Sequence, residues 1–275
     1  MNFTKKKLKI IFLLFSSILF SQVSQIDSLR GSFIYLLQSK PDNMNKDYVY
    51  NELFSLQISD TKSFFISANR LKFDSIVIGQ INKNPNNLKI DVTSTPKSKF
   101  KFLITQTREN IQFYENIGMT LLSYSSPPIN TWKLINETKI INSISCKKAE
   151  VSYKGRVWTA WYSTDIPFPY GPYKFSGLPG LIVKITDKAG DYDFELVKST
   201  PNIKLKGKII GINKRHYNKA KQVTQKEMLQ AKQNFIENSR HVLESMGTVF
   251  TQDEKEKQKR SEIDKNKLNP IELED

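Results

Sequence analysis

A β-hairpin pattern in the second half of the chain constrains the fold more strongly than any other sequence feature. The strand-like runs 149–153 and 156–162 flank the pair Lys154 and Gly155. A two-residue loop with glycine in second place favours a type I′ turn, because the twist of that turn matches the twist of the strands it joins. The sequence therefore predicts an antiparallel hairpin here, which pairs Val151 with Trp158 and Ala149 with Ala160.

Strand-like runs continue along most of the chain. A second hairpin is predicted from residues 181–186 to residues 192–197, around a turn at 188–191. The segment 70–81 fits either a short helix or a further strand, and its pattern does not decide between them. Other strands are expected at 32–38, 51–58, 63–67, 88–92, 99–105, 110–115, 119–124 and 131–141.

One segment near the end of the chain carries the pattern of a good helix. Thr224 and Glu227 have the spacing of a capping box, in which a hydroxyl and a carboxylate satisfy two backbone donors. Apolar residues then recur near helical spacing, and Gly247 stands where a left-handed C-terminal cap is expected. Many strands and few helices predict a mainly β (α+β) fold, a curved antiparallel sheet or half-barrel with one C-terminal helix packed on it.

The first residues have the pattern of a signal peptide. Four lysines among residues 5–9 precede an apolar run of 11 residues at 10–20. This run is shorter than the about 20 residues that a helix needs to cross a bilayer. Ser21 is small enough to precede the cleavage site, and no cysteine for lipid attachment lies near it. We therefore expect a periplasmic or secreted protein that does not span the membrane once the signal is removed.

The chain is strongly basic. Its formal charge is +15, and removal of the four leader lysines leaves +11. Such a charge favours anionic surfaces, among them nucleic acid, acidic polysaccharide and phosphorylated lipid headgroups. Export argues against nucleic acid as the partner. The basic residues are scattered, apart from a group at Lys204, Lys206, Lys208, Lys214 and Arg215.

Composition divides the chain into three parts. Residues 1–21 are the signal peptide, and residues 22–251 contain the strand and helix patterns of a single β-rich domain. Residues 252–275 are mostly charged and poor in apolar residues, which predicts a mobile tail.

An aromatic segment followed by a proline–glycine hexapeptide carries a family resemblance. Residues 166–175 contain Ile166-Pro167 and Gly171-Pro172, and they lead into the hexapeptide Gly177-Leu178-Pro179-Gly180-Leu181-Ile182. This region resembles the GLPGLI family, and residues 269–273 resemble the end of its members. The resemblance implies an exported bacterial protein without an established biochemical activity, and it assigns no catalytic residue.

The hexapeptide also has a physical interpretation. Pro179 followed by Gly180 predicts a type II turn, since glycine accepts the positive φ that this turn requires. Gly177 is expected at a bulge or a close backbone approach. Alternatively, aromatic residues around the hexapeptide line a groove for an apolar or sugar ligand; the candidates are Trp161, Phe168, Tyr170, Tyr173 and Phe175.

Residues able to carry catalysis are few. His216 and His241 are not in a metal-ligand spacing, and Cys146, the only cysteine, has no histidine near it in sequence. We expect no metal or cofactor. Paired carboxylates about 5–10 Å apart cleave glycosidic bonds, and Asp165 with Glu150, beside Arg156, is the candidate pair.

Three functions stay open on these observations. The first is a non-catalytic binding or accessory protein of the cell envelope, with an apolar or lipid ligand in a cavity between sheet and helix. The second is a hydrolase that acts on an envelope polymer. The third is a partner of an outer-membrane receptor that uses an exposed strand edge.

Overall fold

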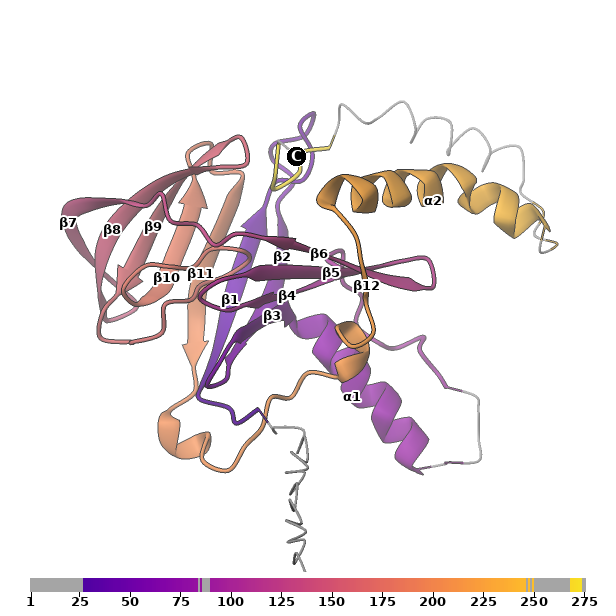
Figure 1. Cartoon of the computed structure of the whole chain (residues 1–275), viewed down its shortest axis with the longest axis horizontal. Helices are drawn as coiled ribbons and strands as arrows, with labels where there is room; N and C mark the ends of the chain where they lie inside the picture. The colour runs from indigo at the N-terminus through magenta and orange to yellow at the C-terminus, as the bar shows by residue number, and fades with distance from the viewer. Residues whose placement is uncertain are drawn as a thin grey trace, which may run out of the picture.

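A single curved sheet of 12 strands forms the body of the protein in this computed structural model (Figure 1). The structure describes residues 27–83, 85, 90–245, 247, 249 and 268–273. The strand order is β12-β6-β5-β4-β3-β2-β1-β11-β10-β9-β8-β7, and every pairing is antiparallel except that of β12 with β6. The strands are β1 Gly31–Ser39, β2 Tyr50–Ile58, β3 Ser63–Ser67, β4 Phe102–Gln106, β5 Ile111–Ile117, β6 Thr120–Ser126, β7 Lys133–Ile141, β8 Ile144–Tyr153, β9 Arg156–Ser163, β10 Leu181–Asp187, β11 Tyr192–Ser199 and β12 Lys221–Gln222.

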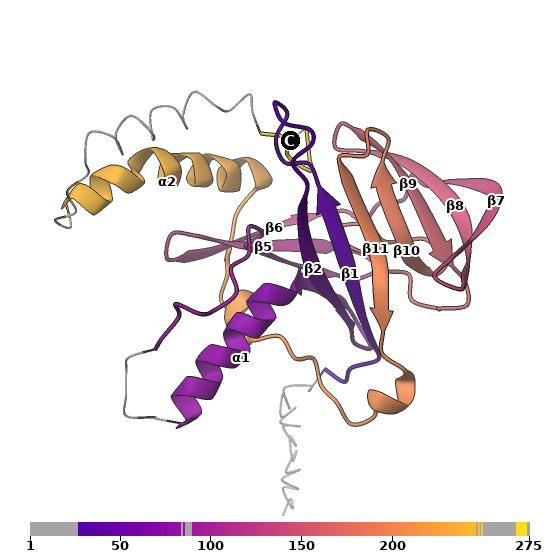
Figure 2. The same cartoon turned by 180° about the vertical axis from the view of Figure 1, so that it is seen from behind.

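Two α-helices lie on opposite sides of β5 and β6 in both views (Figures 1 and 2). They are α1 Ala68–Lys83, which contacts β2 and β3, and α2 Gln225–Ser245, which contacts β5 and β6. Two short 3₁₀ helices, Asn202–Lys204 and Lys214–His216, lie in the connection between β11 and β12. This arrangement confirms the predicted fold class, and it settles the ambiguous segment 70–81 as helix.

The two predicted hairpins are confirmed. Val151 pairs with Trp158 and Ala149 with Ala160, as the loop length requires. Lys154 has φ 49° and Gly155 has φ 75°, so both turn residues have the positive φ of a type I′ turn. The second hairpin is formed by β10 and β11.

The strand predicted at 88–92 is wrong for residues 90–92, while residues 88 and 89 lie outside the described residues. The Asp91 carboxylate accepts hydrogen bonds from the backbone N–H and the hydroxyl of Thr93, at 2.9 and 2.6 Å. Short polar side chains of this kind offer the backbone a turn in place of a strand ladder.

The sheet is buried on both faces where the helices cover it. On β3, Phe65 belongs to the main core, whereas Phe64 and Ile66 join a smaller core with Leu71 of α1. Successive strand residues point to opposite faces of the sheet, so these three consecutive residues pack into two separate cores. This alternation leaves different side chains available on the α1 side and on the α2 side of the sheet.

Helix α2 begins with the predicted capping box. Thr224 N–H donates to Glu227 Oε2 at 2.7 Å, and Glu227 N–H donates to Thr224 Oγ1 at 3.1 Å. At the other end Gly247 has φ 87°, as a left-handed cap requires. Met228 of α2 is buried in the main core, and Ala231 packs against it.

The end of the chain returns to the sheet. Residues 268–273, which the sequence assigns to a mobile tail, contact the body: Asn269 is buried and donates to the carbonyl of Lys40 at 2.8 Å. The expected signal peptide and residues 252–267 lie outside the described residues. In the part of the chain that is described, neither helix has the length and apolar character needed to cross a membrane.

Candidate functional site

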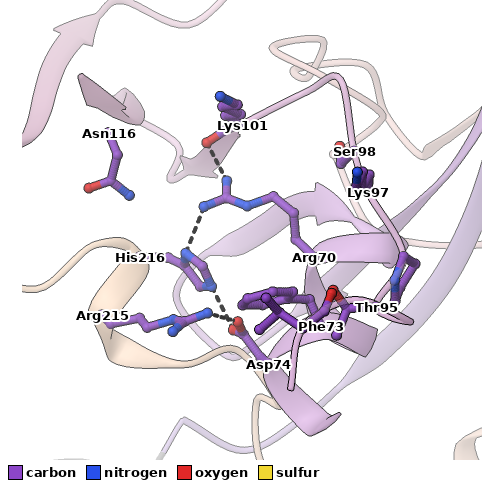
Figure 3. Close-up of a pocket in the computed structure, with 12 residues that line it drawn as sticks. Arg70, Phe73, Asp74, Thr95, Lys97, Ser98, Lys101, Asn116, Arg215 and His216 are labelled. Carbon is purple, nitrogen blue, oxygen red and sulfur yellow. Dashed lines mark hydrogen bonds and ion pairs between the residues drawn. The ribbon is translucent and has the colours of Figure 1, made fainter. Parts of the chain in front are cut away.

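A cavity of about 730 Å³ lies between α1, the segment 92–101 and the 3₁₀ helix Lys214–His216 (Figure 3). Four basic side chains line it, together with one carboxylate, Asp74; the basic residues are Arg70, Lys97, Lys101 and Arg215. We call this cavity the basic pocket. Its composition points to an anionic ligand.

Helix α1 supplies two of the charged residues. Arg70 and Asp74 are four residues apart, so they lie on one face of the helix, one above the other. The helix begins after Ser67, whose Oγ accepts hydrogen bonds from the backbone N–H of Asn69 at 3.1 Å and of Arg70 at 3.4 Å. This N-cap fixes where Arg70 leaves the backbone.

His216 connects the two α1 residues. Arg70 Nη2 is 2.8 Å from His216 Nδ1, and His216 Nε2 is 2.6 Å from Asp74 Oδ2 (Figure 3). A guanidinium has only donors, so Nδ1 must accept and the ring proton must be on Nε2. Both ring nitrogens are therefore engaged, and the imidazole is held as the neutral Nε2–H tautomer.

Asp74 also receives a charged partner, Arg215, whose Nη2 donates to Asp74 Oδ1. Burial alone would raise the pKa of Asp74. The hydrogen bond from His216 and the guanidinium of Arg215 outweigh burial, so the pKa of this carboxyl lies below its usual value. Burial lowers the pKa of Arg70, against the opposing charge of Asp74.

A second buried carboxylate positions the far wall of the basic pocket. Glu52 is 3% exposed and accepts hydrogen bonds from the Tyr50 hydroxyl at 2.7 Å and the Ser98 hydroxyl at 2.5 Å. The Ser67 hydroxyl donates to it as well. Because Ser98 lies between Lys97 and Lys101, Glu52 fixes the loop that carries both lysines relative to the start of α1.

The remaining donors of the basic pocket are available to a ligand. Among the described residues, the ammonium groups of Lys97 and Lys101 have no hydrogen-bond or ion-pair partner, and Arg215 uses only Nη2 on Asp74. Phe73, Val92 and Pro96 add an apolar wall. The pocket can thus accept an anionic group with an apolar portion beside it.

The five aromatic candidates belong to the main core or pack against it, but they do not share one cavity. Tyr173 and Phe175 are buried in the main core. Phe168 and Tyr170 line a separate cavity of about 420 Å³. Trp161 is half-buried, and the ammonium groups of Lys139 and Lys148 each lie 5.8 Å from its ring. The structure does not bring the five into one groove, and their role in ligand binding stays a prediction.

The hexapeptide forms a different turn from the predicted type II turn. Gly180 N–H donates to the carbonyl of Leu178 at 2.8 Å, whereas Leu181 N–H donates to Ile166 instead of closing the four-residue turn. Gly180 has φ 155°, and a Cβ there would lie 2.0 Å from the carbonyl oxygen of Ser163. Glycine is needed because two backbone segments meet at this position.

The predicted close approach at Gly177 is confirmed. Its φ is 92°, and a Cβ there would lie 2.8 Å from the carbonyl oxygen of Ile129. The residues that follow form β10, in which Leu181, Ile182, Val183 and Ile185 are all buried. The hexapeptide thus leads directly into β10, a buried strand of the sheet.

Of the candidate catalytic residues, His216 lies in the basic pocket, and the others do not join it there. Cys146 is buried on β8, where burial raises the pKa of its thiol to about 11, and its hydrogen bond goes to the carbonyl of Ile144. Arg156 pairs with Asp187 at 2.7 Å rather than with Glu150, which lies 3.8 Å from Lys148. Asp165 follows β9. His241 is on α2 and lies 3.7 Å from Glu244. No cluster of metal-ligating side chains occurs among the described residues.

Sequence reasoning missed Arg70 and Asp74 because the pattern of segment 70–81 fits a helix and a strand equally. Their four-residue spacing becomes informative only when the segment is helical. The other signal was a histidine next to Arg215 in a basic loop, but the contact between residues 74 and 216 joins positions far apart in the chain.

A family model described as "Protein of unknown function (Porph_ging)" matches residues 150–184 of this chain. That stretch includes the first hairpin from Glu150 onward and the whole hexapeptide. A comparison with curated proteins finds no match.

Among solved structures, the chain is similar to PNGF-II in two crystal forms. Both comparisons give a TM-score of 0.50 over 74% of this chain, at 14% and 13% sequence identity. The similarity is one of fold. The chain spans about a third of the length of PNGF-II, 34% and 33% in the two forms. An uncharacterized conserved protein from Thermus thermophilus aligns at a TM-score of 0.32 and 9% identity, over 71% of this chain and 91% of that one.

Proposed function

We propose that this chain is an exported, non-catalytic binding protein of the cell envelope, and that the basic pocket takes the phosphate-bearing headgroup of an envelope lipid. The observation that carries the proposal is the excess of cationic side chains over carboxylate in a cavity of about 730 Å³. Export rests on the leader at residues 1–21, with the product in the periplasm or released from the cell.

The geometry suits a phosphate group. Guanidinium groups bind phosphate through paired N–H donors, and lysines add point charges. Arg215 offers Nη1 and Nε beyond its contact with Asp74, and Lys97 and Lys101 face the same cavity. The apolar wall at Phe73, Val92 and Pro96 would lie against the part of the lipid next to its headgroup.

Binding fits this pocket better than hydrolysis. A general base needs a nitrogen or oxygen free to take a proton, and both nitrogens of His216 are engaged by Arg70 and Asp74. His216 therefore positions Arg70, and the Asp74 carboxylate positions Arg215. A hydrolase that acts on an envelope polymer stays the alternative.

An outer-membrane partner would use a free sheet edge. The edge strand β7 exposes Leu134 and Ile140. It also carries Lys133, Glu137 and Lys139 and a register irregularity between Ile135 and Thr138. Edge charges and bulges discourage strand addition, so we rank this alternative below lipid binding.

The test measures binding of the mature protein to vesicles of phosphatidylglycerol and of phosphatidylcholine by co-sedimentation at low salt. The double substitution Lys97→Gln and Lys101→Gln should weaken binding to phosphatidylglycerol about 30-fold, because each lysine near an anionic surface contributes ~1 kcal/mol. The matched control is Lys188→Gln with Lys198→Gln, which removes the same charge from exposed positions on the β10–β11 hairpin.

The control should bind within threefold of the unmodified protein. Equal weakening by both double variants would mean that net charge alone attracts the vesicles, and the proposed pocket would then have no role. Phosphatidylcholine also carries a phosphate, but its headgroup has no net charge, so equal binding to both lipids would contradict recognition of an anionic headgroup by the basic pocket.

A further inference from the structure

A buried lysine lies on the other face of the sheet, away from the basic pocket. Lys174 is 0% exposed, and its Nζ donates to the Tyr124 hydroxyl at 2.7 Å and to Glu272 Oε1 at 2.5 Å. The rings of Phe113, Tyr124 and Tyr173 surround the ammonium group, with centroids 5.1–5.2 Å away. Burial lowers the pKa of Lys174, and the Glu272 carboxylate opposes that shift. The Glu272 carboxylate is the anion that faces this ammonium group.

That anion comes from the end of the chain. Glu272 belongs to residues 268–273, which are separated from α2 by more than 20 positions in sequence. The segment is fixed mainly through Asn269, which accepts from Arg156 Nη2 at 2.6 Å and from the Tyr192 hydroxyl at 2.5 Å. Glu272 itself is held by Lys174 and by the Tyr173 hydroxyl at 2.9 Å. The attachment of the segment and the charge on Lys174 are therefore separate interactions.

A cavity of about 260 Å³ lies beside this ion pair, between β4–β6 and α2. Its walls include the rings of Phe100, Phe102 and Phe113 and the side chain of Met228. Tyr124, Tyr173 and Glu272 also line it, whereas Lys174 does not. Four further charged side chains line the cavity: Lys99, Lys101, Glu115 and Lys232. The cavity thus combines an aromatic wall with charged side chains, and one of its carboxylates, that of Glu272, pairs with the buried Lys174.

We propose that this cavity binds a monocarboxylate with an apolar body, and that Glu272 is a built-in occupant of the carboxylate position. The ligand carboxylate takes the place of the Glu272 carboxylate on Lys174 Nζ and the Tyr173 hydroxyl, while its apolar part fills the aromatic cavity. Glu272 then moves into solvent, where its charge is hydrated. Residue 269 keeps its own contacts.

The charge pattern separates this site from the basic pocket. At the Glu272 position, the Lys174 ammonium group and the Tyr173 hydroxyl match one carboxylate. Two of the other lysines of the cavity are already engaged, Lys99 with the Tyr48 hydroxyl and Lys232 with Glu115. The two sites also lie on opposite faces of the sheet: Glu115 of β5 lines the cavity, and its neighbour Asn116 lines the basic pocket. Of the described residues, Lys101 is the one whose side chain lines both cavities.

The test compares decanoate with decanol, which has the same chain length without the charge, by isothermal titration calorimetry. Glu272→Gln removes the competing charge and should bind decanoate at least tenfold more tightly than the unmodified protein, with no gain for decanol. Adding Lys174→Met, a change of similar volume, should abolish the gain. Glu137→Gln, on the exposed strand β7, is the matched control and should change nothing. Thermal melts establish that each variant is folded.

A second measurement uses the unmodified chain. The Leu273 N–H donates to the carbonyl of Lys154 at 3.0 Å, so its hydrogen exchange reports whether the Glu272 end is docked. Saturating decanoate should speed that exchange, and decanol should not. Unchanged exchange, or equal gains for decanoate and decanol in Glu272→Gln, would overturn the inference and leave the ion pair as a purely structural contact.

Discussion

Replacing Asp74 by alanine should destabilise the fold by about 2–4 kcal/mol. The carboxylate and His216 are each only 5% exposed, and a buried hydrogen bond to a charged group contributes ~1.5–3 kcal/mol. The contact with Arg215 adds less, about 0.2–1 kcal/mol, because that side chain is 46% exposed and its charge is screened by solvent. Removing the carboxylate also leaves Arg70 and Arg215 without the anion between them.

The assay is urea unfolding at neutral pH, followed by circular dichroism. In a domain of this size each kcal/mol shifts the Tm by roughly 2–4 °C, so a thermal melt gives an independent value. Asp74→Asn keeps an oxygen that accepts a hydrogen bond from the His216 N–H. It should therefore lose about half as much free energy of unfolding as Asp74→Ala. The control is Asp60→Ala, which removes an exposed carboxylate paired with Arg30 and should have little effect.

The loss should also depend on pH. The pKa of Asp74 is lowered in the folded state, so its contribution is fully present above the unfolded value of about 3.9 and is lost as pH falls from there through the lower pKa of the folded state. The difference in free energy of unfolding between the unmodified protein and Asp74→Asn should therefore shrink below about pH 4. A loss under 0.5 kcal/mol for Asp74→Ala at neutral pH would refute the account of Asp74 as the centre of the pocket.

Two further substitutions test the fold that presents the sites. Gly180→Ala should lower the free energy of unfolding in urea by about 3 kcal/mol, because its Cβ would lie 2.0 Å from the Ser163 carbonyl oxygen. The control is Gly190→Ala, at φ 66° with open space around it, which should lose about 1 kcal/mol. Equal losses would argue against the close approach at Gly180. Thr224→Ala should cost about 1 kcal/mol and reduce the helical signal in circular dichroism, since it removes the cap of α2; an unchanged protein would show that the capping box is dispensable.

The sequence predicted local structure well wherever a turn or cap has its own chemistry. The pair Lys154 and Gly155 determined both turn type and register, and Thr224 with Glu227 located the start of α2. The type II turn at Pro179 was wrong because Gly180 is required for a different reason, the approach of Ser163 from another part of the chain. A local pattern cannot show which distant backbone arrives at a glycine.

The candidate sites depend on contacts of this long-range kind. Each of them combines residues of the sheet body with residues that follow β11: His216 reaches Asp74 on α1, and Glu272 reaches Lys174 in the segment before the hexapeptide. Up to β11 the chain builds all strands of the sheet except the short β12, and the chain beyond β11 supplies the partners that neutralise buried charge on each face. Because those partners come from loops and from the terminus, they can move without breaking a strand pairing, whereas Asp74 and Lys174 are fixed by the packing around them. Exchange of a ligand for a protein group is therefore expected first at Arg215 and Glu272, the partners contributed from outside the sheet.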